Sequence, residues 1–328
     1  MRHILLALLT GVSLAAGAPI AMGQSSLSRL PPPAFALPPE SITVTATKPS
    51  AETIESYVDT RAQPTYVLGR MARWTKPVCP VTLGLGDKYA KYITRRIREM
   101  ATAVGAPVNG DPTCKPNIEV MFTLNPQTLM DNVRKDHPIL LGYQHNEREA
   151  DELAKVTHSI QAWYSTISQD INGSTFVDDG TCGFGGTRLN TMPYRDGAGI
   201  VSAETVLPCA KVMNVTGSRA VDGLNSGFFN IVIVADPSRL LDYEVGTLGD
   251  YVAMMALSQP ASLDRCQDLP SISNLLAKGC TAIPSWITDG DLAFLKGLYS
   301  TPSGYSMTAQ RSEMQYQMKK TLVTDKGG

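Results

Sequence analysis

Apolar residues recur with two different periods along most of the chain and so mark out its helices and strands. Residues 87–104 carry an apolar residue at every third or fourth position, the period of an amphipathic helix, and Gly105 supplies a stop. Residues 117–123 alternate between apolar and polar side chains, whereas residues 228–236 are almost continuously apolar and rich in β-branched residues. The alternation predicts a half-buried strand and the continuous run predicts a strand buried on both faces.

Shorter stretches of the same two patterns predict the remaining elements. The expected helices are 54–61, 125–135, 146–157, 247–258, 289–299 and a short one containing Met314 and Met318; the expected strands are 160–167 and 199–208. Asn146 with Glu149, and Thr288 with Asp291, have the spacing of helix-capping boxes. Helices and strands in this order predict an α+β fold in which helices pack on a mixed sheet.

The N-terminal region differs in composition from the rest. Residues 1–23 combine Arg2, a short apolar run and a small-x-small site that ends at Gly23, as in a cleavable export signal. Residues 24–55 are rich in proline, serine and threonine and predict a flexible arm, and residues 56–328 predict a single folded domain. We therefore expect a periplasmic or extracellular protein, and no segment after the leader is long and apolar enough to predict a membrane span.

Charge and cysteine content refine this expectation. Without Arg2 the chain has 28 basic and 30 acidic residues, a balance that argues against nucleic acid as a partner. An even number of cysteines in an exported chain predicts disulfides. We favour sequential pairing because each pair then brackets one compact segment: Cys79–Cys114, Cys182–Cys209 and Cys266–Cys280.

Known catalytic and cofactor motifs are missing from the sequence. It has no Gly-x-Ser-x-Gly nucleophile elbow, no phosphate-binding glycine loop and no unpaired cysteine under this pairing. His137, His145 and His158 are 8 and 13 residues apart, which matches no common metal-ligand spacing. A composite metal site using two of them with Glu147 or Glu149 is the alternative to surface or capping histidines. We expect no catalytic residue, no bound metal and no cofactor.

The order of motifs resembles that of the zincin metalloproteases, metzincins in particular. The matching segments are 116–122, Ala256-Leu257-Ser258, Ser271-Ile272-Ser273, Thr288-x-x-Asp291 and Leu298-Tyr299. They resemble the zincin strand after the long helix, the Ala-Leu-Gly that follows the zinc motif, the Ser-Ile-Met turn and the closing helix. The resemblance implies a single zincin-like domain.

The zinc motif itself, His-Glu-x-x-His, does not carry over. One alignment places Tyr251 and Met255 at the histidine positions, and a shift by one residue places Asp250 and Met254 there. Neither alignment supplies two ligands and a general base. The resemblance therefore implies a pseudoenzyme.

Two further resemblances cover smaller parts of the chain. Cys79-Pro80, Pro116-Asn117-Ile118, residues 160–164 and residues 291–295 resemble secreted bacterial proteins grouped under domains of unknown function. Residues 41–48, with Ile42, Val44 and Ala46 alternating, are similar to the strand-forming box of TonB-dependent outer-membrane receptors. A β-prone linker is the alternative interpretation of that segment.

Together these patterns predict an exported, non-catalytic zincin-like protein that binds a peptide, a protein or another component of the cell envelope. Two alternatives remain open. One is a secreted hydrolase with a non-standard active site, and the other is an accessory of TonB-linked uptake that acts through the Ile42–Ala46 segment.

Overall fold

The computed structural model describes residues 48–182, 187–190, 194–196, 199–201, 204–211, 213–218 and 221–324. The chain divides into two units, Met1–Ala46 and Thr47–Gly328, and every described residue belongs to the second. The first helix, α1 (Ala51–Arg61), begins with Ser50, whose side chain accepts a hydrogen bond from the Thr53 N–H. The folded part therefore starts several residues before the expected boundary at 56.

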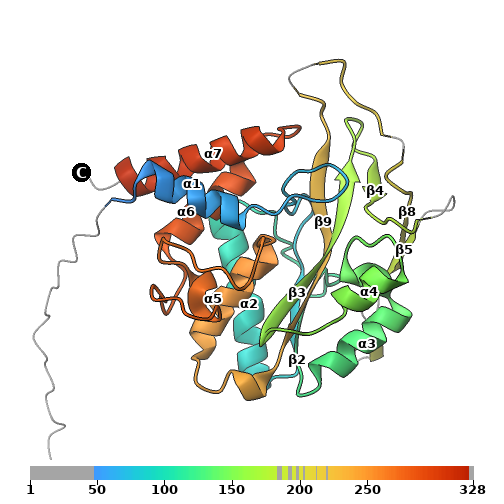
Figure 1. Cartoon of the computed structure of the whole chain (residues 1–328). Coiled ribbons are helices and arrows are strands. Elements are labelled where there is room, and N and C mark those ends of the chain that lie inside the picture. Colours follow the sequence, from blue (N-terminus) through green and yellow to red (C-terminus); the bar gives the residue numbers. More distant parts are fainter. Residues whose placement is uncertain are drawn as a thin grey trace, which may run out of the picture. The chain divides into compact units, whose positions relative to one another are not determined.

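A mixed five-stranded sheet forms the centre of this unit (Figure 1). Its strands, in spatial order, are β1 (Pro80–Leu83), β2 (Ile118–Phe122), β9 (Asn225–Ala235), β3 (Ile160–Gln169) and β4 (Thr175–Val177). The first three run parallel, and β3 is antiparallel to β9. Strand β4 pairs antiparallel with β3 over three residues only, Ile167 to Gln169. This mixed sheet confirms the predicted α+β fold class.

Helices cover one face of the sheet in a large layer (Figure 1). Besides α1, these helices are α2 (Asp87–Val104), α5 (Val245–Leu257), α6 (Asp289–Ser300) and α7 (Met307–Lys319). Helix α2 has the predicted boundaries, because its stripe of Ile93, Ile97 and Met100 is buried and Gly105 ends it in the left-handed conformation at φ 83°. A residue with a side chain adopts that conformation less readily than glycine.

A smaller layer covers the other face. It consists of α3 (Pro126–Asp136), the 3-10 helix η1 (Pro138–Leu141) and α4 (Glu147–Leu153). Successive residues of β9 pack in opposite directions: Ile231 and Ile233 face the large helical layer, and Val232 and Val234 face the smaller one. The strand is therefore buried on both faces, as its apolar run predicts.

Helix α4 is shorter than predicted. Asn146 caps it, accepting a 3.1 Å hydrogen bond from the Glu149 N–H, but the helix ends at Leu153 and not at 157. The side-chain amide of Gln161 holds the residues that follow in a turn. It accepts a hydrogen bond from the Thr157 N–H at 2.8 Å and donates one to the Lys155 carbonyl at 2.9 Å. This contact from β3 competes with continuation of the helix, and sequence periodicity could not reveal it.

The single strand predicted for residues 199–208 was also wrong. The structure has two short strands there, β7 (Gly199–Val201) and β8 (Glu204–Leu207). They pair with different partners, β7 with β6 (Tyr194–Asp196) and β8 with β5 (Thr187–Asn190). An extended run looks the same in sequence whether or not its hydrogen-bonding partner changes along the way.

The three disulfides confirm the predicted sequential pairing. Cys79–Cys114 joins the residue before β1 to the loop before β2, Cys182–Cys209 joins the segments that follow β4 and β8, and Cys266–Cys280 closes a loop between α5 and α6. Such bonds are typical of proteins that fold in oxidising compartments. Within the described ranges, no helix has the length and apolarity needed to cross a membrane.

Candidate functional site

Helix α5, which corresponds to the zinc-binding helix in the zincin resemblance, is buried from Thr247 to Leu257. The side chains of Tyr251, Met254 and Met255 are therefore enclosed by protein and do not face an open cleft. Burial raises the pKa of the Tyr251 phenol to about 12, so it stays protonated at neutral pH. A thioether and a protonated phenol are poor zinc ligands, and these positions form ordinary core packing.

Asp250, the fourth of these positions, has a structural partner. Its buried carboxylate forms an ion pair with the half-buried Arg96 of α2, and its other oxygen accepts a 2.8 Å hydrogen bond from the Ile287 N–H. The hydrogen bond to Asp250 raises the pKa of Arg96, so the guanidinium stays protonated. Asp250 thus joins α2, α5 and the segment that leads into α6.

The segments that resemble the zincin turn and closing helix meet at Asp291. This fully buried carboxylate accepts hydrogen bonds from the Ser271 hydroxyl at 2.6 Å and the Ile272 N–H at 2.9 Å. It also completes the predicted capping box with Thr288. The network fixes the turn against α6, and we assign it a role in stability because Ser271, Ile272 and Asp291 are buried.

The histidines do not gather into one site. His137 ends α3, His145 pairs with Glu149 at 2.9 Å, and His158 contacts Asp264 at 3.1 Å. In the part of the chain that the structure describes, no group of three or more His, Cys, Asp or Glu residues could hold a metal ion. The Ile42, Val44 and Ala46 segment lies outside the described residues.

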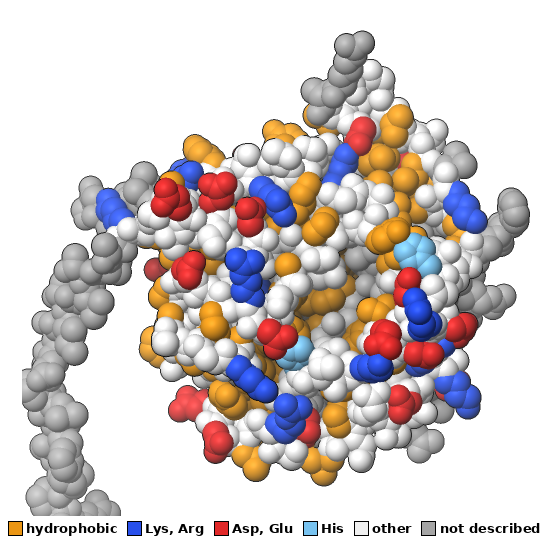
Figure 2. Space-filling view, viewed as in Figure 1, with side chains coloured by type: hydrophobic (Ala, Val, Ile, Leu, Met, Phe, Trp, Pro, Cys, Tyr) orange, Lys and Arg blue, Asp and Glu red, His pale blue; other side chains and the backbone are white. Residues whose placement is uncertain are grey.

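A cleft of about 500 Å³ lies beside the outer edge of β3. Figure 2 shows the face on which β3 lies toward the viewer in Figure 1, and this face is hollowed near its centre. The lining comes from β3 itself, from the loops around Tyr66 and Gly142, from the turn after α4, and from Gln259 after α5. None of these segments belongs to the zincin motifs.

The floor of the cleft is a strand edge that is paired on one side only. Asp236 N–H donates to the Ser159 carbonyl at 2.9 Å, so odd-numbered residues of β3 before the bulge at Ser165/Thr166 bond toward β9. By the alternation of an antiparallel ladder, the N–H and C=O groups of Ala162 and Tyr164 point to the opposite side. Strand β4 pairs only from Ile167 onward, and among the described residues no other strand covers this edge.

Side-chain contacts on both faces hold this edge in place. The Trp163 indole N–H donates to the Leu153 carbonyl at 2.6 Å, and the Tyr164 hydroxyl donates to the Met255 carbonyl at 3.0 Å. Gly142 approaches the edge with φ 101°, and a Cβ atom there would lie 2.9 Å from the Tyr164 carbonyl oxygen. Glycine at 142 therefore keeps a side chain out of the space beside the strand.

A pair of stacked tyrosines forms part of the rim. The rings of Tyr66 and Tyr143 lie 4.0 Å apart at 15°, and His145 meets both edge-on. Tyr66 is 63% exposed although it is a large aromatic residue. The stack joins two loops that are far apart in the sequence, and it places apolar ring surface beside a polar strand edge.

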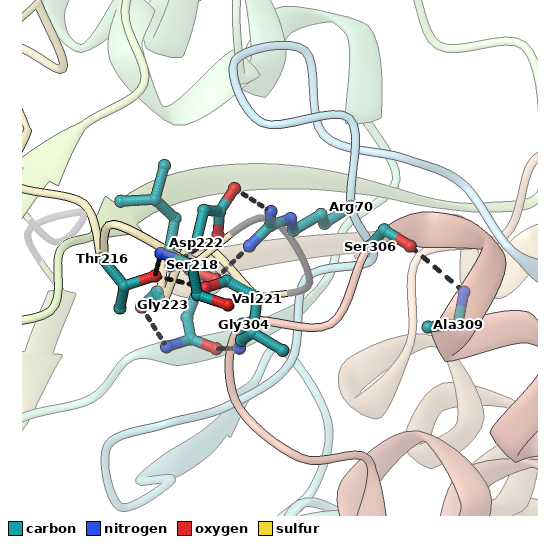
Figure 3. A network of polar contacts seen from close by, with 11 residues as sticks. Arg70, Thr216, Ser218, Val221, Asp222, Gly223, Gly304, Ser306 and Ala309 are labelled. Atoms are coloured by element: carbon teal, nitrogen blue, oxygen red, sulfur yellow. Dashed lines mark hydrogen bonds and ion pairs between the residues drawn. The ribbon is translucent and has the colours of Figure 1, made fainter.

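Buried polar contacts anchor the loop that carries Tyr66. The Arg70 guanidinium pairs with Asp222, as Figure 3 shows, and also donates to the Leu224 carbonyl. The Thr65 hydroxyl lies 2.8 Å from that of Ser226 at the start of β9. This wall of the cleft is thus tied to the sheet, so the cleft is largely formed before any ligand binds.

The cleft has almost no net charge. Its charged lining residues, Glu152 and Lys155, pair with each other at 2.6 Å. Side-chain amides supply much of the remaining polarity, and among the described residues those of Gln63 and Gln259 make no hydrogen bond. Such a lining suits a neutral ligand that offers both donors and acceptors, as a peptide backbone does.

One ionisable group lies buried just beyond the cleft. Asp178 accepts hydrogen bonds from the hydroxyls of Thr166, at 2.8 Å, and Ser168, at 2.7 Å. Burial raises the pKa of this carboxyl, with the two hydroxyl donors opposing the shift. Because both oxygens are engaged and enclosed, we assign Asp178 to holding the segment after β4 against β3.

Sequence reasoning found the strand at 160–167 but not the cleft beside it. A strand edge is open when no other strand pairs with it, and this depends on the tertiary structure. Gly142 and the exposed Tyr66 are the only local signals that could have drawn attention to the region.

Comparisons with known proteins identify no relative of this chain. No protein-family model matches the chain, and no curated protein or solved structure shows significant similarity to it.

Proposed function

We propose that this protein is an exported, non-catalytic zincin-like protein that binds an extended peptide segment of a cell-envelope protein along the open edge of β3. The observation that carries the proposal is the run of unpaired main-chain groups at Ala162 and Tyr164 inside a preformed cleft. Strand addition to an exposed sheet edge is a common mode of peptide recognition, in which main-chain hydrogen bonds provide affinity and neighbouring pockets provide specificity.

The order of elements supports the zincin-like part of the proposal. A long helix, α2, precedes β2; the buried strand β9 leads into α5; and α6 follows with its capping box. The burial of α5 supports the non-catalytic part, because a zinc hydrolase needs an open position at its metal. The three disulfides and the predicted leader support export.

The geometry also favours a position for the added strand. Strand β4 already occupies the β3 edge from Ile167 to Gln169. A bound peptide would lie beside Ala162, at the part of the edge away from β4, because the Asp178 N–H donates to the Thr166 carbonyl and Gly142 lies against the Tyr164 carbonyl. The amides of Gln63 and Gln259 are part of the cleft lining and can bond peptide groups that the strand edge does not reach.

A single substitution can remove the edge donor and leave the rest of the sheet intact. In Ala162→Pro the lost N–H is the one that points away from β9, whereas Ala162→Val keeps it.

The probe is a synthetic octapeptide of alternating Thr and Val, with a twin N-methylated at alternate residues so that it cannot pair. We expect the octapeptide to bind wild type and Ala162→Val, at least 10-fold weaker binding to Ala162→Pro, and none by the twin.

Thermal unfolding of the three proteins checks that Ala162→Pro remains folded. Equal affinity of the octapeptide and its N-methylated twin would show that main-chain pairing is not the mode of binding and would overturn the proposal.

The alternative functions make different demands. A TonB-linked accessory would lose TonB binding when residues 40–48 are deleted, and unchanged binding would remove that idea. A hydrolase would need a concave cluster of a histidine with carboxylates, and the three histidines after the leader lie at separate places. We therefore favour peptide binding.

A further inference from the structure

A second surface, away from the cleft, gathers exposed apolar residues. Ten large hydrophobic residues are exposed in the described part of the chain, and five of them lie on two adjoining hollows: Tyr89, Leu241, Tyr243, Ile283 and Trp286. Leu241 is 83% exposed and Trp286 is 69% exposed. Soluble proteins rarely leave apolar side chains gathered in this way unless the surface binds something.

The two hollows form one groove. One has a volume of about 680 Å³ and includes Leu85, Phe122 and Leu248; the other has about 650 Å³ and includes Tyr92, Ile283 and Trp286. Tyr243, Glu244 and Gly246 line both, so the segment before α5 is a ridge between them. We call this surface the ridge groove. It shares no lining residue with the β3 cleft.

The ridge groove lies where the parallel strands end. Strands β1, β2 and β9 finish at Leu83, Phe122 and Ala235, and the first hollow is lined by residues at or just after these ends, namely Leu85, Phe122 and Pro237. Loops at the carboxyl ends of parallel strands are a frequent place for binding sites, because they are held by a rigid sheet yet free of its hydrogen bonding.

The charged residues of the groove favour a positively charged occupant. Four line it, and two of these, Arg96 and Asp250, pair with each other. The other two are the exposed carboxylates of Asp242 and Glu244, and neither has a side-chain hydrogen bond or ion pair within the described residues. The groove thus presents two uncompensated negative charges among aromatic and aliphatic side chains.

From this combination we infer that the ridge groove docks a segment of a partner protein in which lysine or arginine alternates with large apolar residues. The apolar side chains enter the two hollows on either side of Tyr243, and a cation meets Asp242 and Glu244. Exposed tryptophan and tyrosine are the residue types that most often dominate protein interfaces, and the Trp286 ring also attracts a cation that approaches its face.

Trp286 makes the inference testable without a known partner. Trp74 and Trp163 are buried, so acrylamide quenching of the protein's fluorescence reports mainly on Trp286. The probe is a 14-residue synthetic peptide of alternating leucine and lysine, with two twins in which glutamate replaces lysine or serine replaces leucine. We expect the Leu/Lys peptide to protect Trp286 from quenching and to bind at least 10-fold more tightly than either twin at low salt.

Variants separate the apolar and the charged contributions. Leu241→Ser with Ile283→Ser removes exposed side chains only, and should weaken binding about 10-fold or more. Asp242→Asn with Glu244→Gln should weaken it about fivefold and abolish most of its salt dependence. Val215→Ser with Tyr316→Ser, on exposed hydrophobic residues outside both hollows, is the matched control and should leave binding unchanged.

Three results would overturn the inference. The first is failure of the Leu/Lys peptide to protect Trp286, and the second is equal binding of the glutamate twin. The third is protection of Trp286 by neutral phosphatidylcholine vesicles when the peptides give none, because the groove would then be a membrane-contacting surface.

Discussion

The hydroxyl of Tyr57 in α1 donates a 2.5 Å hydrogen bond to the carboxylate of Asp291 in α6, although 234 residues separate them in the chain. Both side chains are buried, and burial is the main cause that raises the pKa of Tyr57 well above its ordinary value. The phenol therefore remains protonated, and a donor, at neutral pH. This bond ties α1, the first helix of the folded unit, to α6.

Replacing Asp291 should destabilise the fold strongly. Asp291→Asn removes an acceptor oxygen from a site where five donor groups converge, and leaves at least one of them unsatisfied in the core. We expect a loss of about 2–4 kcal/mol in the free energy of unfolding by urea. Asp289→Asn, on an exposed residue two positions earlier in the same helix, should cost less than about 1 kcal/mol. Similar losses in both variants would contradict the buried network.

Placing histidines at the positions that the zincin resemblance aligns with zinc ligands should not create a zinc site. In Tyr251→His with Met255→His, both imidazoles would lie in the core and lack a general base, since Val252 occupies that position. We expect less than 0.1 equivalent of zinc by elemental analysis and a loss of about 3 kcal/mol or more in stability.

Wild type should likewise purify without stoichiometric zinc and without peptidase activity. Stoichiometric zinc that disappears on changing His137, His145 or His158 would refute the pseudoenzyme proposal.

The Cys266–Cys280 bond should stabilise the connection between α5 and α6. It closes a 15-residue loop, counted from a sequence separation of 14, and the chain-entropy model assigns such a loop about 3 kcal/mol. Replacing both cysteines by serine should lower the unfolding free energy by about that amount. Faster proteolysis within the loop, with an unchanged free energy of global unfolding, would show that the loop unfolds separately from the core.

Asp178 should make stability depend on pH in a definite direction. Burial raises its folded-state pKa above the unfolded value, so the folded protein holds this proton more tightly. The contribution of this group is favourable below the unfolded pKa and is lost as pH rises through the folded pKa. The difference in unfolding free energy between wild type and Asp178→Asn should therefore decrease with rising pH, by at most about 1.4 kcal/mol per unit. A difference that grows with rising pH would show that the two hydroxyl donors outweigh burial.

The open edge of β3 predicts an alternating pattern of hydrogen exchange. In the free protein the amides of Ala162 and Tyr164 should exchange faster than those of Gln161 and Trp163, because only the latter point toward β9. Residue-resolved exchange measured by NMR checks this, and a bound strand should slow the fast pair selectively. Uniform protection along β3 would mean that the edge is already covered in the free protein.

Local patterns in the sequence predicted the elements whose formation depends on their own side chains. The stripe of α2 and the glycine after it specified both ends of that helix, and Thr288 with Asp291 specified the start of α6. The sequential cysteine pairing was likewise correct, because each pair encloses one compact segment. Helix α4 was predicted too long because Gln161, on another element, holds the turn that ends it.

The sequence by itself thus determined an α+β chain with disulfides and without the zincin ligands. Only the tertiary structure decided where the candidate binding sites lie, because packing and strand pairing depend on residues far apart in the sequence. An apolar residue in α5 and one in the ridge groove look alike in sequence, and only the packing around them makes Met254 core and Trp286 surface. In the same way, the hydrogen-bonding groups of Ala162 are present in every peptide unit, and they become a candidate binding site only because no strand of the described fold pairs with them.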